Sequence, residues 1–185
     1  ESSRKIGAAI CQSHTVRALS FTGSTAAGIS LAQQAASTVK KVSLELGGNA
    51  SFIVFDDADI DRAVQGALAA KFRNSGQTCV CANRFFVQSK VYEKFVDGFS
   101  AAVSKLRVGP GIDPDVSVGP LIDNRAHQKV QDIVSDAVAR GAKLAVGGNC
   151  NSMDGRFFPP TVLTKVTPEM RLASEEIFGP VAPIF

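Results

Sequence analysis

The sequence predicts an α/β fold with a mainly parallel sheet. Short apolar runs typical of strands alternate along the chain with segments of helical period, and glycine turns separate several of them. Such alternation favours parallel pairing, because each helix carries the chain back to the end of the sheet where the previous strand began. With 45% apolar residues among 185, the chain is long enough to bury a sizeable core.

The first elements are expected to be a helix at the start of the chain, a strand, a glycine turn, a second helix and a second strand. The apolar run 18–21 ends in Thr-Gly-Ser-Thr, and the small residues of 26–37 suit a helix. Residues 42–46 alternate Val or Leu with Ser or Glu, which is the pattern of a strand.

A third strand is expected over 52–55, followed by a helix that ends near Arg73. Asp57 and Asp59 are expected to supply the N-cap and the first-turn carboxylate of this helix, where its dipole is positive. Apolar residues at helical spacing mark its buried face: Ile60, Ala63, Val64, Ala67 and Leu68.

The next pair is expected to be a strand over 84–88 and a helix over 91–106. A connection rich in Pro and Gly follows. Asp123 is then expected to cap a helix that stops at Gly141, because glycine commonly ends helices. The inward residues of these two helices are expected to be Phe95, Val96, Phe99, Val103 and Leu106 in the first, and Val130, Ile133, Val134, Ala137 and Val138 in the second. Further strands are expected over 144–146 and 161–166.

Composition and charge argue against several functional classes. The net charge is +3 without a basic block interleaved with aromatics, so we expect no nucleic-acid partner. No apolar run approaches the ~20 residues of a membrane helix, so we expect no membrane partner. Two histidines and no Cys-x-x-Cys predict no metal site. Four cysteines lack the paired framework of a small secreted domain and fit a reducing compartment: Cys11, Cys79, Cys81 and Cys150.

The two ends of the sequence predict a segment of a longer protein. Glu1 stands where a start methionine is expected, and the chain stops within the apolar run 183–185. We therefore expect any targeting region to lie outside this sequence.

Cys79 is the strongest candidate for a nucleophile. It follows a helix-like segment on a turn that contains Gly76, whereas a structural cysteine usually sits in an apolar run. Its polar neighbours Gln77, Thr78 and Asn83 are the setting expected of a thiol that meets a ligand. The attacking species would be the thiolate.

Two further features suggest a base and a phosphate site. Glu45 is flanked by Leu44 and Leu46, so it is either a desolvated carboxylate suited to general-base work or a residue on the solvent face of a strand. The turn 23–28 follows a strand and opens a helix, whose free N–H groups suit a phosphate, although most such turns are only turns.

The remaining candidates also have two interpretations. Arg73 is either a partner of the helix dipole or a fixed cation beside Cys79. Cys81 is either a core residue or a second functional thiol. The acidic pair in Glu175-Glu176-Ile177-Phe178-Gly179-Pro180 is either a charged helix end or part of the site.

Taken together, four motifs resemble the aldehyde dehydrogenase superfamily. They are Phe-Thr-Gly-Ser-Thr at 21–25, Leu-Glu-Leu-Gly-Gly at 44–48, Gly-Gln-Thr-Cys at 76–79 and Glu-Glu-Ile-Phe-Gly-Pro at 175–180, in that family's order and spacing. The run 71–83, with its second cysteine, is similar to the signature of the succinate-semialdehyde dehydrogenase subfamily.

This resemblance implies a role for each candidate residue. Cys79 would be the nucleophile and Glu45 the base, and Arg73 would bind the distal carboxylate of the substrate, to which a guanidinium donates two hydrogen bonds. Cys81 would form a redox-regulated disulfide with Cys79. NAD or NADP would contact Gly23, Ser24, Thr25, Gly28, Leu46, Glu176 and Phe178.

The resemblance also implies an architecture and a biological setting. Residues 1–46 would end a Rossmann-type cofactor domain, and 47–185 would belong to an α/β catalytic domain truncated at its C-terminus. The chain alone is not expected to be active. The full-length parent would be a homo-oligomer, dimer or tetramer, located in the mitochondrial matrix if eukaryotic or the cytoplasm if bacterial.

Three functions remain open from the sequence. The first is NAD(P)-dependent oxidation of succinate semialdehyde to succinate, the second is oxidation of a related semialdehyde such as glutarate semialdehyde, and the third is a non-catalytic nucleotide-binding or thiol-sensing module.

Overall fold

A computed structural model describes residues 2–148 and 155–185. Cys150 lies outside the described residues. The chain divides into two compact units, Glu1–Gly48 and Asn49–Phe185. Among the described residues, no helix has both the length and the apolar character needed to cross a membrane.

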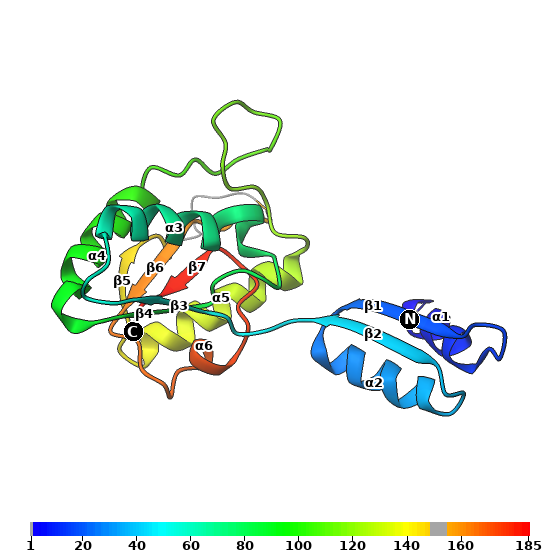
Figure 1. Ribbon diagram of the computed structural model, residues 1–185. Helices are drawn as coiled ribbons and strands as arrows, with labels where there is room; N and C mark the ends of the chain where they lie inside the picture. The colour runs from blue at the N-terminus through cyan, green and yellow to red at the C-terminus, as the bar shows by residue number, and fades with distance from the viewer. Residues whose placement is uncertain (1, 149–154) are drawn as a thin grey trace. The chain divides into compact units, whose positions relative to one another are not determined.

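The first unit is a parallel β-α-β arrangement preceded by a helix (Figure 1). It comprises α1 (Ser2–Gln12), β1 (Ala18–Gly23), α2 (Thr25–Ala36) and β2 (Lys41–Leu46). β1 and β2 pair in parallel, and α2 packs against both strands and against α1. The order of elements predicted for this part of the chain is confirmed.

The second unit contains most of the helices and strands that the structure describes. They are β3 (Ser51–Val54), α3 (Ile60–Phe72), the short 3₁₀ helix η1 (Arg73–Gly76), β4 (Arg84–Val87), α4 (Ser89–Val103), α5 (Asn124–Ala139), β5 (Lys143–Val146), β6 (Thr161–Thr164), α6 (Arg171–Ser174) and β7 (Val181–Pro183).

The strands of the second unit are mainly parallel, as predicted. β3 pairs with β4 and β6 with β7, both in parallel, whereas β5 is antiparallel to β6. A parallel bridge between Phe85 and Ile184 joins the two groups of strands. The Phe185 N–H donates to the Phe85 carbonyl at 2.8 Å, and the Val87 N–H donates to the Phe185 carbonyl at 3.1 Å. β4 and the end of the chain therefore connect the two groups.

Helices cover both faces of this sheet, with α3 and α4 on one side and α5 on the other (Figure 1). Strand alternation explains the two layers, because successive side chains point to opposite faces. Val162 and Ala182 pack with the α3 and α4 residues, while their neighbours Leu163 and Val181 pack with those of α5.

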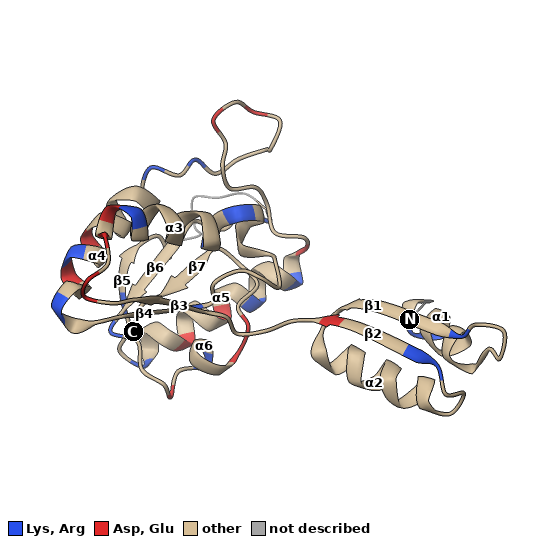
Figure 2. Ribbon diagram, in the orientation of Figure 1, with Lys and Arg blue, Asp and Glu red and all other residues tan. Residues whose placement is uncertain are grey.

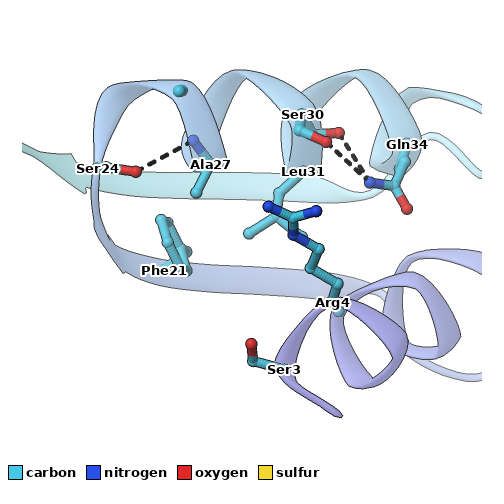
Figure 3. Close-up of a pocket in the computed structure, with 10 residues that line it drawn as sticks. Ser3, Arg4, Phe21, Ser24, Ala27, Ser30, Leu31 and Gln34 are labelled. Carbon is cyan, nitrogen blue, oxygen red and sulfur yellow. Dashed lines mark hydrogen bonds between the residues drawn. The ribbon is translucent and has the colours of Figure 1, made fainter. Parts of the chain in front are cut away.

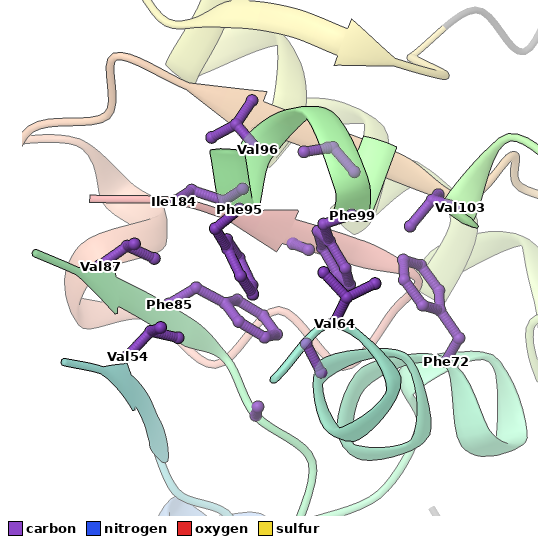
Figure 4. Packing of buried hydrophobic residues seen from close by; sticks show 14 of the residues in the cluster. Val54, Val64, Phe72, Phe85, Val87, Phe95, Val96, Phe99, Val103 and Ile184 are labelled. Carbon is purple, nitrogen blue, oxygen red and sulfur yellow. The ribbon is translucent and has the colours of Figure 1, made fainter. Parts of the chain in front are cut away.

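Phenylalanine rings fill the layer between the sheet and helices α3 and α4 (Figure 4). Phe99 lies at the centre: its ring centroid is 5.5 Å from that of Phe85, 5.4 Å from that of Phe95 and 6.1 Å from that of Phe72. Tilted and offset rings at these separations add favourable contacts to the area that they bury. This cluster fixes α3, and the loop that follows α3 and η1 carries the candidate nucleophile.

Three details of the predicted helices were wrong. Asp59, not Asp57, is the N-cap of α3: its carboxylate accepts from the Arg62 N–H at 3.1 Å, and Asp61 supplies the first-turn charge. Asp57 lies in a turn two residues before the N-cap, too early in the chain to accept from the first N–H groups of α3. Val138 is 41% exposed because it lies off the apolar stripe of α5. Leu106 follows α4, which ends at Val103.

The cap and stop of α5 are confirmed. The Asp123 carboxylate accepts from the Ala126 N–H at 2.8 Å. Gly141 follows the C-cap residue with φ of +102°, a conformation that favours glycine because it has no Cβ. Over α4, acidic and basic residues are interspersed on the outer surface (Figure 2).

Candidate active site

Cys79 lies on an exposed turn after three residues of left-handed backbone. Asn74, Ser75 and Gly76 have φ of 51°, 58° and 73°. Such conformations cost about 1–3 kcal/mol for residues other than glycine, and they persist where surrounding contacts enforce them. The Cys79 thiol is free and exposed. The structure therefore presents this thiol on a strained loop, which is where functional residues concentrate.

Hydrogen bonds from two loop residues enforce this conformation. The Ser75 hydroxyl donates to the Gly119 carbonyl at 2.9 Å. The Gln77 side chain donates to the Pro120 carbonyl at 3.3 Å and accepts from the Ile122 N–H at 2.9 Å. The loop that carries Cys79 is thus attached to 119–122.

The polar neighbours of Cys79 do not all face a ligand, and this expectation was wrong for Asn83. Its side chain is only 3% exposed and bonds to other parts of the second unit. Gln77 is half-buried and serves the loop as described above. Amide side chains away from water need hydrogen-bond partners. Asn83 and Gln77 find them in backbone groups that make no hydrogen bond within a helix or strand.

Cys81 is buried, in contrast to Cys79. The Lys71 ammonium donates to the Cys81 sulfur at 3.5 Å, and the Cys81 thiol faces the Lys71 and Ala82 carbonyls at 3.5 and 3.3 Å. Lys71 is itself 0% exposed. Burial lowers the pKa of the Lys71 ammonium, and the nearby Cys81 and Glu176 oppose this shift.

Arg73 lies at the end of α3 with an exposed side chain. Among the described residues, no carboxylate forms an ion pair with its guanidinium. The Arg73 guanidinium therefore has no carboxylate partner among the described residues, and its predicted place beside Cys79 stays a prediction.

The segment 175–180 lies against the Cys79 loop. A Cβ on Gly76 would meet the Gly179 carbonyl oxygen at 2.2 Å, so the two backbones are in direct contact. Phe178, with φ of 55° and 37% exposure, lines a cavity of about 390 Å³ together with Asn74 and Gln77. The structure thus brings Phe178 beside the loop of the candidate nucleophile.

The two acidic residues of this segment differ in their surroundings. Glu175 ends α6 and forms an ion pair with Arg171 at 3.0 Å, so the charged-helix-end interpretation holds for it. Glu176 is half-buried, and its carbonyl accepts from the Lys129 ammonium at 2.7 Å.

In the first unit, a cavity of about 620 Å³ lies at the start of α2 (Figure 3). Ser24 caps this helix by accepting from the Ala27 N–H at 3.4 Å. The first N–H groups of the helix have no intrahelical partner. Phe21 lines the cavity, and the Arg4 side chain reaches from α1 toward α2 (Figure 3). A cation and a helix N-terminus together suit a phosphate group.

Gly28 and Leu46 are in direct contact within this unit. A Cβ on Gly28 would meet the Leu46 side chain at 2.6 Å, so this glycine lets α2 approach β2. Thr25 is the first residue of α2, directly after Gly23 and Ser24.

Glu45 is exposed, which favours the second of its two interpretations, a residue on the solvent face of a strand. The reason is strand geometry, since both leucines point to the opposite face of β2. Glu45 belongs to the first unit and Cys79 to the second. That Glu45 and Cys79 act at one site stays a prediction.

Two polar residues of the site were missed by sequence reasoning, Lys71 as a buried charge and Asn83 as a buried amide. For Lys71 the signal was present: it lies one helical step after Ile60, Val64 and Ala67, on the apolar face of α3. For Asn83 no local signal exists, because its side-chain partners lie far away in the chain, at Asn49, Glu175 and Ile177.

Comparisons with known proteins are consistent with this geometry. The Aldehyde dehydrogenase family model matches residues 1–185. The chain is 58% identical over 180 residues to the mitochondrial succinate-semialdehyde dehydrogenase of Arabidopsis thaliana, covering 97% of this chain and 34% of the relative. It is 55% identical over 184 residues to the 3-sulfolactaldehyde dehydrogenase of Pseudomonas putida, covering 100% and 38%.

A solved succinate-semialdehyde dehydrogenase from Burkholderia pseudomallei superimposes with a TM-score of 0.97 at 56% identity, covering 98% of this chain and 38% of that one. The chain therefore spans little more than a third of the length of these relatives. Because the family model covers every residue and the fold agrees, this chain belongs to the aldehyde dehydrogenase family.

Proposed function

We propose that this chain supplies the nucleophile and part of the cofactor site of a longer subunit that oxidises succinate semialdehyde to succinate with NAD or NADP. The observation that carries the proposal is the exposed Cys79 thiol on a left-handed loop, with the exposed Arg73 close in sequence. In this proposal residues 1–46 end the cofactor domain, and 47–185 belong to the catalytic domain.

The first unit would hold the phosphates of the cofactor. The cavity at the start of α2 fits its phosphates, because the helix N-terminus, Ser24 and Arg4 supply hydrogen-bond donors and positive charge. Gly23, Thr25 and Gly28 would let the backbone lie close to the phosphates. Leu46 would pack beneath these residues. Glu176 would hold the nicotinamide ribose, and Phe178 would pack near the nicotinamide. When bound, the cofactor accepts the hydride from the substrate.

Cys79 would attack the aldehyde carbon as a thiolate and form a tetrahedral alkoxide. A trigonal aldehyde releases hydride poorly, whereas the alkoxide releases it and leaves a thioester on Cys79, so one difficult step becomes two easier ones. The backbone N–H of Cys79 would donate to the alkoxide, and one such donor is typically worth ~100- to 1,000-fold in rate. Glu45 would then deprotonate the water that hydrolyses the thioester.

Arg73 would select the substrate by its distal anion. A guanidinium binds a carboxylate through two parallel hydrogen bonds. Succinate semialdehyde carries such a carboxylate, glutarate semialdehyde carries it one methylene farther away, and 3-sulfolactaldehyde carries a sulfonate. A related semialdehyde is therefore the second candidate substrate.

Cys81 would regulate the enzyme by forming a disulfide with Cys79 under oxidation. The bond would be strained because the loop is short, and strained disulfides are easily reduced. Its formation requires Cys81 to leave Lys71. Reversible loss of activity to peroxide should disappear in Cys81→Ala, and unchanged reversibility would refute the switch.

The full-length parent would be a homo-oligomer, dimer or tetramer. Its compartment would follow its source, the mitochondrial matrix in a eukaryote and the cytoplasm in a bacterium.

The test is NAD(P)H absorbance in a full-length subunit that carries this chain, supplied with aldehydes with and without a distal carboxylate. We expect turnover that is lost in Cys79→Ser, and a preference for the carboxylate that is lost in Arg73→Ala. Retained turnover in Cys79→Ser would refute the mechanism. Cofactor binding without aldehyde oxidation would instead favour the non-catalytic nucleotide-binding module, and an unchanged preference in Arg73→Ala would refute the substrate assignment alone.

A further inference from the structure

We propose that Asn83 is a positioning residue that fixes the backbone around Glu176 relative to the loop of Cys79. The inference deepens the proposed function, because it rests on the role given there to Glu176 in holding the cofactor. Asn83 itself would touch neither cofactor nor substrate.

The Asn83 amide bonds to the chain on both sides of Glu176. Its Nδ2 donates to the Glu175 carbonyl at 3.2 Å, and its Oδ1 accepts from the Ile177 N–H at 3.0 Å. The side chain is 3% exposed, so water does not compete for these groups. A side-chain amide carries its donor and its acceptor on separate atoms and can serve both groups at once, which suits asparagine to this position.

The Glu176 backbone has no regular secondary structure to hold it. Residues 175–178 belong to neither helix nor strand. Side chains supply the hydrogen bonds that a helix or sheet would otherwise provide. Asn83 bonds to Glu175 and Ile177, and Lys129 donates to the Glu176 carbonyl at 2.7 Å. Ile177 is 0% exposed and anchors the next position. The Glu176 carboxylate is thereby held on a fixed backbone.

Asn83 is in turn fixed to the strand that begins at Ser51 and to the loop of Cys79. Its N–H donates to the Ala50 carbonyl at 2.9 Å, and its Nδ2 also donates to the Asn49 side chain at 2.5 Å. The neighbouring Ala82 N–H donates to the Ala70 carbonyl at 3.1 Å, closing the loop between α3 and β4.

Asn49 adds a parallel connection to the same segment. Its Nδ2 donates to the Ala173 carbonyl at 2.8 Å. The side-chain amides of Asn49 and Asn83 thus join the nucleophile loop to 173–177. The separation between the Cys79 thiol and the Glu176 carboxylate would depend on this pair of amides.

The experiment is a double-mutant cycle in the full-length subunit, with Asn83→Ala, Glu176→Gln and the combined variant. The first measurement is the dissociation constant of NADH or NADPH, taken from nucleotide fluorescence, which requires no turnover. The second is the rate of Cys79 alkylation by iodoacetamide, and the third is the melting temperature. Ser100→Ala is the matched control, because the buried Ser100 hydroxyl makes no hydrogen bond among the described residues.

We expect Asn83→Ala to weaken cofactor binding about 10-fold, the equivalent of one hydrogen bond of ~1.4 kcal/mol. In the Glu176→Gln background the same change should have an effect of less than about 2-fold, because groups that act through each other are not additive. Cys79 alkylation should stay within about 2-fold of the parent. Ser100→Ala should leave cofactor binding and Cys79 alkylation unchanged and should not lower the melting temperature.

An equal effect of Asn83→Ala on the cofactor dissociation constant in the parent and in Glu176→Gln would overturn the proposal. A loss of both cofactor binding and Cys79 alkylation would also overturn it, because that result marks a merely structural role. A parental dissociation constant in Glu176→Gln would overturn it together with the role of Glu176. A subunit that binds cofactor but oxidises no aldehyde would refute the proposed function alone. Should Asn83→Ala not fold, Asn83→Ser supplies the same comparison.

Discussion

Gly76 lies against the backbone of Gly179, so that position 76 has no room for a side chain. A Cβ on Gly76 would lie 2.2 Å from the Gly179 carbonyl oxygen and 2.6 Å from its carbon. This contact joins the left-handed loop before Cys79 to the segment that carries Glu176 and Phe178. Two parts of the candidate site that lie far apart in sequence thus share one rigid contact.

Gly76→Ala is therefore expected to destabilise the protein by at least about 2 kcal/mol. The φ of +73° costs an L-residue about 1–3 kcal/mol, and the overlap with backbone forces one segment to move. Urea unfolding measures the loss. Gly111→Ala is the matched control, because a Cβ added there would have no atom within 4 Å. Equal stability of the two variants would contradict the contact.

Gln77→Ala is expected to release 120–122 from the Cys79 loop. The Ile122 N–H loses its acceptor at 2.9 Å, so its amide hydrogen should exchange faster, by about 5- to 10-fold for a bond of ~1 kcal/mol. Hydrogen exchange read at Ile122 measures this. The control is Gln34→Ala, because the hydrogen bonds that the Gln34 amide makes in the described part of the chain go to Ser30 of its own helix. An unchanged rate at Ile122 in Gln77→Ala would show that this bond does not protect the amide.

The sequence predicts most of the strands and helix faces because their signals are local. The apolar run at 52–55 and the stripe of Ile60, Val64 and Ala67 need no knowledge of distant residues. Asp123 was identified as a cap for the same reason, since its bond to Ala126 spans one helical turn.

Long-range contacts explain what the sequence does not reveal. The role of Asn83 depends on Glu175 and Ile177, which lie more than 90 positions later in the chain. The antiparallel direction of β5 is set by the path of the chain after α5, which periodicity does not encode. For Glu45 the sequence left two interpretations open, and strand geometry decides between them, since adjacent leucines in a strand face away from the carboxylate and do not cover it.

Phe99→Ala is expected to destabilise the second unit by about 3–5 kcal/mol, the usual cost of removing a buried aromatic side chain. Phe99 is 0% exposed and contacts three other rings, so few neighbours are free to collapse into the space. Urea unfolding followed by circular dichroism measures the change. Ile112→Ala, at a residue 94% exposed, should change stability by less than about 0.5 kcal/mol. A loss for Phe99→Ala no greater than this would contradict the packing.

Lys71→Met is expected to flatten the pH dependence of stability at alkaline pH. Burial lowers the pKa of Lys71 in the folded chain below its ordinary value of 10.5, so the folded state binds fewer protons than the unfolded state. Stability of the parent should therefore rise as the pH increases through the window between the lowered pKa and 10.5, and below that window the full cost of burying the charge applies. Methionine has a similar shape and no charge, so its variant lacks this rise.

The measurement is the free energy of unfolding in urea from pH 7 to pH 10 for the parent and Lys71→Met. We expect the difference between them, methionine variant minus parent, to become less positive as the pH rises. The same pair in a Cys81→Ala background removes the thiol that faces the ammonium at 3.5 Å, which should enlarge the pH dependence because a group that favours the charged lysine is gone. A difference that stays constant over this range would mean that Lys71 carries the same charge in the folded and unfolded chain, and that its burial is fully compensated by Cys81 and Glu176.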